Sequence, residues 1–236
     1  MPDLGSFLKG AHVDRSVFEL RPDYRAMLLA VDGIRPGAGD EDSEALLVAA
    51  EASVREPADR PVEELPHIAS WREAYRAFGA KPQRTRNSLE ALTRRAGSEA
   101  GLPRVNRLTD IYNAISVIHQ VPLGGEDLNR YVGSPRLIRA TGEEPFDTVA
   151  DGADVVVHPE AGEVVWCDEI GVTCRRWNWR QATRTRLHDG TTAALFILDA
   201  LDPMTDQDLD GVADDLLTNV ARLGPNVHSA RRVIRP

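Results

Sequence analysis

The pattern of apolar positions predicts helices in the first half of the chain. Apolar residues recur at intervals of three and four over residues 67–78 and over 108–119, a spacing that places them on one face of a helix. Residues 40–54 have acids at the start and apolar residues at near-helical spacing, and 89–96 is a helix-forming run that follows the capping residue Asn87. These four segments are therefore predicted to be helices.

A change of period near residue 122 predicts strands in the second half. Short runs rich in β-branched residues alternate with turn-like sequences at 137–139, 154–157, 163–168, 172–177 and 191–198. An early hairpin with strands at 18–20 and 26–31 is also predicted, together with a loop at 56–66, a last helix at 209–223 and a basic tail. Helices and strands are segregated rather than alternating, so the pattern favours an α+β fold over a doubly wound sheet.

Composition and motifs narrow the function classes. The chain has 42% hydrophobic and 28% charged residues and neither an apolar run of membrane-spanning length nor a secretion signal, so we expect a cytoplasmic protein without membrane contact. Cys167 and Cys174 flank a turn and are expected to be plain thiols in strands. GxxxxGK[ST], GxGxxG, HExxH and GxSxG sequences are absent, and the histidines lack metal-ligand spacing. His119 is expected to be a helix C-terminal cation, with a catalytic base as the alternative. We expect no metal and no cofactor.

Charge is distributed unevenly along the chain. The net charge is -9, yet residues 68–110 carry 9 bases and 4 acids, whereas residues 1–67 carry 14 acids and 7 bases. Such segregation fits a protein that contacts a polyanion on one face. Ordinary helix surfaces with salt-bridged arginines are the alternative.

The densest candidate chemistry lies in residues 175–180, where three arginines and two tryptophans share six positions, and it continues through Thr183. Guanidinium groups bind phosphates and carboxylates, and indoles stack on bases or pack a core. A strand through this run would alternate its side chains, with Arg176, Asn178 and Arg180 on one face and Arg175, Trp177 and Trp179 on the other. The run is therefore either a substrate-binding wall or a core strand with snorkelling arginines.

Two smaller patches carry polar groups. Asn106, Asp110 and Asn113 share one face of the predicted helix over 108–119 and could read hydroxyls or a base edge. Glu144 lies in a tight turn, Gly-Glu-Glu-Pro-Phe, where a carboxylate could position a water or bind an amine. N-capping by Asn106 and a solvated turn acid are the structural alternatives.

Several ordered segments resemble the stand-alone form of the B3/4 domain, the editing and tRNA-associated module of the phenylalanyl-tRNA synthetase β subunit. They are WREAYRAFG at 71–79, LPRVNRLTDIYNAIS at 102–116, PLGGEDL at 122–128, GEEPF at 142–146 and VVWCDEIGVTCRRWNWR at 164–180. The resemblance runs from Phe18 to Leu201 and includes no catalytic synthetase core.

This resemblance implies an α+β fold in which an unusual β-sandwich is flanked by helices. It implies one domain over residues 1–236, with a family-like core at 18–201 and a C-terminal helix and tail at 202–236. The implied activity is that of a trans-editing deacylase, which hydrolyses the ester bond of mischarged aminoacyl-tRNA in translation quality control. The implied partner is the aminoacylated acceptor end of tRNA, with synthetase association as a further expectation.

The chain departs from the synthetase module at two positions. Gly125 stands where the module has a histidine that contributes to the editing site, and Gln181 or Arg180 stands where it has the glutamate that anchors the mischarged amino acid. Selectivity for tyrosine is therefore not carried over. Asn113 corresponds to an asparagine on the pocket helix of the module.

Ester hydrolysis at the terminal adenosine needs only a positioned water, an oxyanion donor and a ribose hydroxyl of the substrate. We expect Arg176 and Asn178 to contact the substrate and oxyanion, Asn113 to contact the ribose or water, and Glu144 or Asp168 to bind the amino group. The residues expected to complete the substrate and tRNA contacts are Asn106, Trp179, Arg180 and Thr183. A noncatalytic tRNA-binding or synthetase-associated module, and an enzyme acting on a small amino-acid derivative, are the alternatives.

Overall fold

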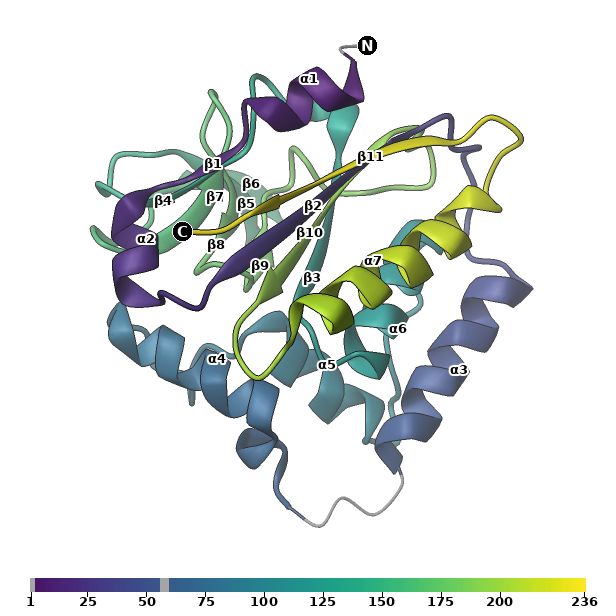
Figure 1. The fold of residues 1–236 in the computed structure, drawn as a ribbon, viewed down its shortest axis with the longest axis horizontal. Helices are drawn as coiled ribbons and strands as arrows, with labels where there is room; N and C mark the ends of the chain where they lie inside the picture. The colour runs from purple at the N-terminus through teal and green to yellow at the C-terminus, as the bar shows by residue number, and fades with distance from the viewer. Residues whose placement is uncertain (1–2, 56–59) are drawn as a thin grey trace.

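Two β-sheets packed face to face form the centre of the computed structural model, which describes residues 3–55 and 60–236 (Figure 1). Within this part of the chain, the first sheet has the order β11-β2-β10-β3 and is antiparallel throughout. Its strands are β2 (Arg25–Asp32), β3 (Leu123–Asp127), β10 (Ala194–Ala200) and β11 (His228–Ile234).

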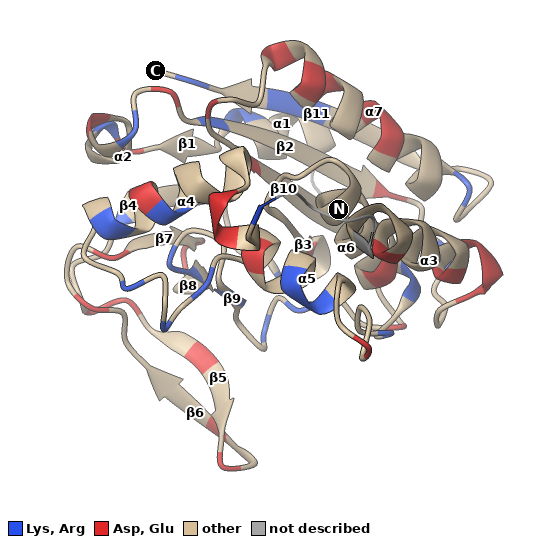
Figure 2. Cartoon of the chain, turned by 90° about the horizontal axis from the view of Figure 1, so that it is seen from below, with Lys and Arg blue, Asp and Glu red and all other residues tan. Residues whose placement is uncertain are grey.

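The second sheet has the order β1-β4-β7-β8-β9, in which only the β1 and β4 pair is parallel. Its strands are β1 (His12–Val13), β4 (Arg136–Arg139), β7 (Val164–Cys167), β8 (Val172–Arg175) and β9 (Arg180–Gln181). A separate hairpin of β5 (Phe146–Ala150) and β6 (Ala153–Val157) projects from this side of the molecule (Figure 2).

Both faces of the first sheet are buried, which explains why β2 and β10 contain long apolar runs, at 26–31 and 194–198. Leu28 and Ile197 belong to the core shared with the second sheet, whereas Met27 and Phe196 pack toward helices α6 and α7. Alternation along a strand thus supplies two different cores from one apolar run.

The helices are α1 (Leu4–Lys9), α2 (Arg15–Leu20), α3 (Glu41–Arg55), α4 (Pro66–Ala77), α5 (Ser88–Ala96), α6 (Arg107–Ile118) and α7 (Asp206–Ala221). Short 3-10 turns occur at η1 (Val62–Glu64) and η2 (Leu128–Arg130). Helices α3, α4, α5, α6 and α7 confirm the helices predicted from the apolar spacing. The α+β fold is confirmed as well, with helices flanking a pair of sheets. Within the described ranges, no helix is both long and apolar enough to cross a membrane.

Three sequence predictions of secondary structure were wrong. Residues 18–20 belong to helix α2 rather than to a hairpin strand, because a short apolar run fits one turn of a helix as well as a strand. The basic tail contains strand β11, which pairs with β2 over seven residues. Strand β8 ends at Arg175, two residues earlier than predicted. Of the predicted loop over 56–66, residues 56–59 lie outside the described part.

The two cysteines are free and buried. In the register of β7 and β8, Cys174 pairs with Trp166 and Cys167 pairs with Val172, so the thiols are not opposite each other. Burial raises the pKa of Cys167 to about 11, which keeps this thiol protonated at neutral pH.

Candidate functional site

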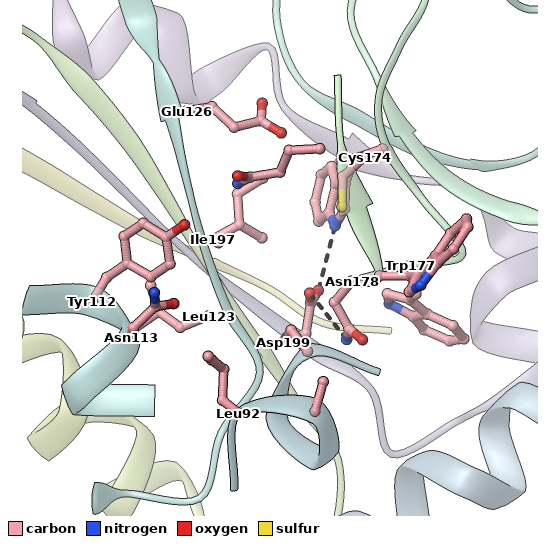
Figure 3. A pocket seen from close by; sticks show the side chains of 16 residues that line it. Leu92, Tyr112, Asn113, Leu123, Glu126, Cys174, Trp177, Asn178, Ile197 and Asp199 are labelled. Atoms are coloured by element: carbon pink, nitrogen blue, oxygen red, sulfur yellow. Dashed lines mark hydrogen bonds between the residues drawn. The ribbon is translucent and has the colours of Figure 1, made fainter. Parts of the chain in front are cut away.

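A cavity of about 240 Å³ lies between the two sheets, where helices α5 and α6 close its side (Figure 3). Its walls come from α5, α6, β3, β7, β8, β9 and β10 and from the turn between β8 and β9. The lining residues that retain solvent exposure form the mouth, and they include Ser88, Ala91, Leu92, Trp179 and Gln181. Glu126 and Leu92 lie at opposite ends of the view in Figure 3.

Helix α6 presents Asn113 to the cavity. Asn106 is the N-cap of this helix, and its Oδ1 accepts a hydrogen bond of 3.0 Å from the backbone N–H of Thr109. One face of α6 packs on the first sheet and another on α3, so Tyr112 and Asn113 are left facing the cavity. Asn113 is only 6% exposed, and its side-chain amide has no hydrogen-bond partner within the described residues. This amide is therefore available to a ligand.

Helix α5 is held at the mouth by a buried acid. Glu90 is fully buried and binds Arg72 of α4 at 2.8 Å and Arg94 at 3.1 Å. Asn87 caps the helix by accepting from the backbone N–H of Glu90. The charge cluster fixes α5 against α4 and so fixes the Ser88 hydroxyl at the mouth, where its oxygen has no partner among the described residues.

The turn after β8 determines the direction of the arginine and tryptophan side chains. Arg176 and Trp177 adopt positive φ values of 48° and 68°, which ends the strand. The predicted strand alternation over 175–180 is therefore wrong. Trp177 is fully buried against Trp71 and Tyr24, with ring centroids 5.3 Å and 4.9 Å away.

Asn178 follows in this turn and points into the cavity. Its Nδ2 lies 3.4 Å from Oδ2 of Asp199, and its Oδ1 accepts from the Tyr75 hydroxyl at 3.1 Å. These two partners fix which end of the amide is the donor. The second N–H of Nδ2 stays free for a ligand.

Asp199 is the buried acid at the base of this network. Its Oδ1 accepts from the Tyr24 hydroxyl at 2.5 Å and lies 3.4 Å from the indole Nε1 of Trp166. Burial raises its pKa to about 7, against the effect of these hydrogen bonds. Asp199 thus links both sheets to the Asn178 amide. The sequence analysis missed it, although an acid inside the apolar run of β10 was the available signal.

Glu126, on β3, is the second acid of the cavity. It is 1% exposed, and its Oε2 has no hydrogen-bond partner among the residues described. Burial raises its pKa to about 7, opposed by hydrogen bonds from Tyr131 and Thr173. Glu126 lies in the Pro-Leu-Gly-Gly-Glu-Asp-Leu segment that resembles the family, but nothing in that segment alone marks it as a site residue.

Trp179 lies at the mouth beneath two guanidinium groups. The guanidinium carbons of Arg176 and Arg180 are 4.6 Å and 4.7 Å from the centroid of its ring. Arg180 is exposed and forms no ion pair with a carboxylate of the described chain, whereas Arg176 hydrogen-bonds to Thr85 and lies 3.5 Å from Glu163. Trp179 lines the cavity, but Arg176 lines a neighbouring hollow of about 290 Å³.

The other residues singled out from the sequence lie outside the cavity. Glu144 closes its own turn by accepting from the backbone N–H groups of Thr141 and Gly142 at 2.8 Å and 3.1 Å. Asp168 accepts from the Arg184 guanidinium at 2.9 Å and from backbone N–H groups. Thr183 donates its backbone N–H to the carbonyl of Asp147 in the separate β5–β6 hairpin. The structure therefore brings together Asn113, Asn178 and Trp179.

Gly125 is tightly enclosed. A Cβ atom at this position would lie 2.7 Å from Cδ1 of Leu187 and 2.8 Å from Cε1 of Tyr112. The histidine of the synthetase module would need these side chains to move. The side-chain amide of Gln181 also donates to the Gly125 carbonyl at 2.8 Å, so the two positions that differ from the synthetase module contact each other.

His119 ends α6 and its Nε2 lies 2.9 Å from Asp215, away from the cavity. Among the described residues, no group of three His, Cys, Asp or Glu is placed to hold a metal ion.

Comparison with known proteins gives two findings. The family model of the B3/4 domain matches residues 70–211, more than half of the chain. Among solved structures, an N-terminal fragment of the phenylalanyl-tRNA synthetase β subunit from Pyrococcus horikoshii is similar, with 12% sequence identity and a TM-score of 0.47 over 95% of this chain. The chain spans 50% of the length of that fragment. No curated protein matches the sequence.

The family match contains all the residues that line the cavity. Residues 70–211 include α5, α6, β3, β7, β8, β9 and β10, which supply all the walls described above. Strands β2 and β11, which lie outside the match, complete the first sheet, and α7, which begins inside the match, covers it. The chain belongs to the B3/4 domain family.

Proposed function

We propose that this protein is a trans-editing deacylase that hydrolyses the ester bond of mischarged aminoacyl-tRNA. The observation that carries the proposal is the cavity of a B3/4 domain in which two amides, Asn113 and Asn178, face a space beside a half-exposed indole. The motifs that resemble the synthetase editing module run through the same walls.

The dimensions and the rim suit an aminoacylated adenosine. A cavity of about 240 Å³ is large enough for an amino-acid side chain with its carbonyl but too small for a folded nucleic acid. The terminal adenine stacks on Trp179 at the mouth in place of the exposed Arg180 guanidinium, since every base stacks on an aromatic ring. Arg180, exposed and without a carboxylate partner in the described chain, is available to a phosphate of the acceptor end.

The chemistry follows from the amide positions. A water molecule attacks the ester carbonyl carbon, and the bond between that carbon and the ribose oxygen then breaks. The ribose oxygen takes the proton released by the water. Asn178, oriented by Tyr75 and Asp199, donates its free N–H to the developing oxyanion, and Asn113 orients the water or the ribose. The neighbouring ribose hydroxyl relays the proton.

The remaining residues act by positioning. Arg176 holds Trp179 from above, and Asn106 fixes the start of α6. Glu144 and Asp168 fix loops outside the cavity, so neither is assigned to the amino group of the substrate. Arg180 and Thr183, which lie outside the cavity, are assigned to contacts with the tRNA.

The test is deacylation of a panel of mischarged tRNAs by the purified protein. We expect release of at least one amino acid well above the uncatalysed rate, and a fall of about 100–1000-fold on Asn178→Ala, as for the loss of an oxyanion donor. No acceleration with any tRNA would overturn the proposal.

A noncatalytic tRNA-binding or synthetase-associated module is the second candidate, and Gly125 favours it. The enclosed glycine leaves no room for the histidine of the synthetase module without movement of Tyr112 and Leu187. Binding of uncharged tRNA that weakens steeply with salt, with no turnover of any charged tRNA, is the result that distinguishes this candidate.

A further inference from the structure

Glu126 is the one acid of the cavity that has an unused oxygen. The carboxylate of Asp199 is occupied by Tyr24, Trp166 and Asn178. In contrast, Oε2 of Glu126 is buried and has no partner among the described residues. A buried acceptor without a partner costs free energy, so this atom is placed where a ligand donor would stabilise it.

The cavity has no cation of its own to balance these acids. Among the described residues, none that line it is a lysine, arginine or histidine. The charged groups near Glu126 outside the cavity are Asp168 and Arg184, which pair with each other at 2.9 Å. The Tyr131 and Thr173 hydroxyls complete its surroundings. A cationic ligand would therefore supply the positive charge that the described cavity lining lacks.

The walls between the mouth and Glu126 are mainly apolar. Leu123, Ile197, Cys174 and the Tyr112 ring line this space, and Figure 3 shows Glu126 beyond them at the end away from Leu92. An alkyl chain that ends in a cation fits this arrangement. Its methylene groups would contact the apolar walls, and its positive charge would lie against the Glu126 carboxylate.

We propose that Glu126 forms the far end of the amino-acid subsite and selects a side chain that ends in a primary amine. This inference rests on the proposed function, since it names the class of amino acid that the deacylase removes. The ammonium group donates to Oε2 of Glu126, and the ester lies near Asn113 and Asn178 at the mouth side.

Binding of small probes tests the subsite without tRNA. Calorimetry of the purified protein at pH 8 compares pentylamine with 1-pentanol, which has the same alkyl chain without the charge. We expect the amine to bind at least tenfold more tightly, and Glu126→Gln to remove this difference. Glu143→Gln, which removes an exposed acid outside the cavity, is the matched control and should keep the preference.

Deacylation then tests the same site on the substrate. Lysine on a noncognate tRNA should be released at least tenfold faster than norleucine on the same tRNA, and Glu126→Gln should equalise the two rates. Equal binding of pentylamine and pentanol by the unaltered protein overturns the inference even if the variant fails to fold. Turnover without any preference for the amine overturns the inference and leaves the deacylase proposal standing. Absence of all turnover overturns the deacylase proposal, while the probe binding still decides whether the amine subsite exists.

Discussion

Gly125 packs directly against Tyr112, so that an added Cβ would lie 2.8 Å from Cε1 of the ring. The contact joins β3 to α6 behind the cavity wall. Glycine at this position is therefore a packing requirement in this chain.

Gly125→His should destabilise the protein by about 1–3 kcal/mol, the usual cost of overpacking a core. It should not increase deacylation, because the imidazole has no space beside Leu187 and Tyr112. Urea denaturation measures the change. Gly211→Ala in α7, where an added Cβ meets nothing within 4 Å, is the control and should stabilise by up to about 1 kcal/mol. A histidine variant as stable as the unaltered protein would contradict the packing argument.

The sequence predicted much of the fold but little of the site geometry. Helix α6 was predictable because its apolar spacing and its cap at Asn106 agree. Helix α2 and strand β11 could not be predicted from the sequence. The secondary structure of such short or polar segments depends on the sheets that they contact. The left-handed turn at Arg176 and Trp177 reorients the side chains that follow it. The sequence does not reveal this turn, because neither residue is the glycine that usually adopts a positive φ. The motif resemblance predicted that Asn113 and Asn178 share a site. It did not predict the acids Glu126 and Asp199, which lie on the neighbouring strands β3 and β10 but far apart in the sequence.

Asn113→Ala should lower kcat by about 10–100-fold, as expected for loss of one positioned polar group. Because the amide makes no hydrogen bond within the described residues, Tm should change by less than about 2 °C. Single-turnover deacylation and thermal unfolding measure the two effects. Asn226→Ala, at an exposed amide between α7 and β11, should change neither. A large fall in Tm for Asn113→Ala would assign the residue a structural role instead.

Arg180→Ala should weaken tRNA binding and reduce the salt dependence of that binding. If the guanidinium contacts one phosphate, the slope of log K against log salt concentration should fall by about 0.7–0.9. The control is Arg15→Ala on α2, which removes the same charge from a side chain that is 92% exposed. Filter binding between 50 and 200 mM salt, on the order of physiological ionic strength, gives both slopes. An equal effect of the two variants would mean that net charge, rather than the cavity rim, governs binding.

The raised pKa of Asp199 makes the free energy of unfolding fall as the pH rises. Its pKa is about 7 in the folded protein and 3.8 as the ordinary value, so between these values the folded state holds a proton that the unfolded state releases. The stabilisation is complete below pH 4 and is lost as the pH rises through 7. Relative to Asp199→Asn, the free energy of unfolding of the unaltered protein should therefore fall from pH 4 to pH 7, by at most about 1.4 kcal/mol per pH unit.

The asparagine variant removes this titration but places an amide beside the Nδ2 of Asn178, where the carboxylate accepted. It should cost about 1–3 kcal/mol at every pH, because one buried donor loses its acceptor. Urea denaturation from pH 4 to pH 8, with Asp210→Asn at an exposed position of α7 as the control, separates the constant cost from the titration. A difference between the two proteins that does not vary with pH would show that Asp199 is ionised throughout. Asp199 would then accept the hydrogen bonds of Tyr24 and Asn178 as a carboxylate, and the cavity would need a cationic ligand even at acidic pH.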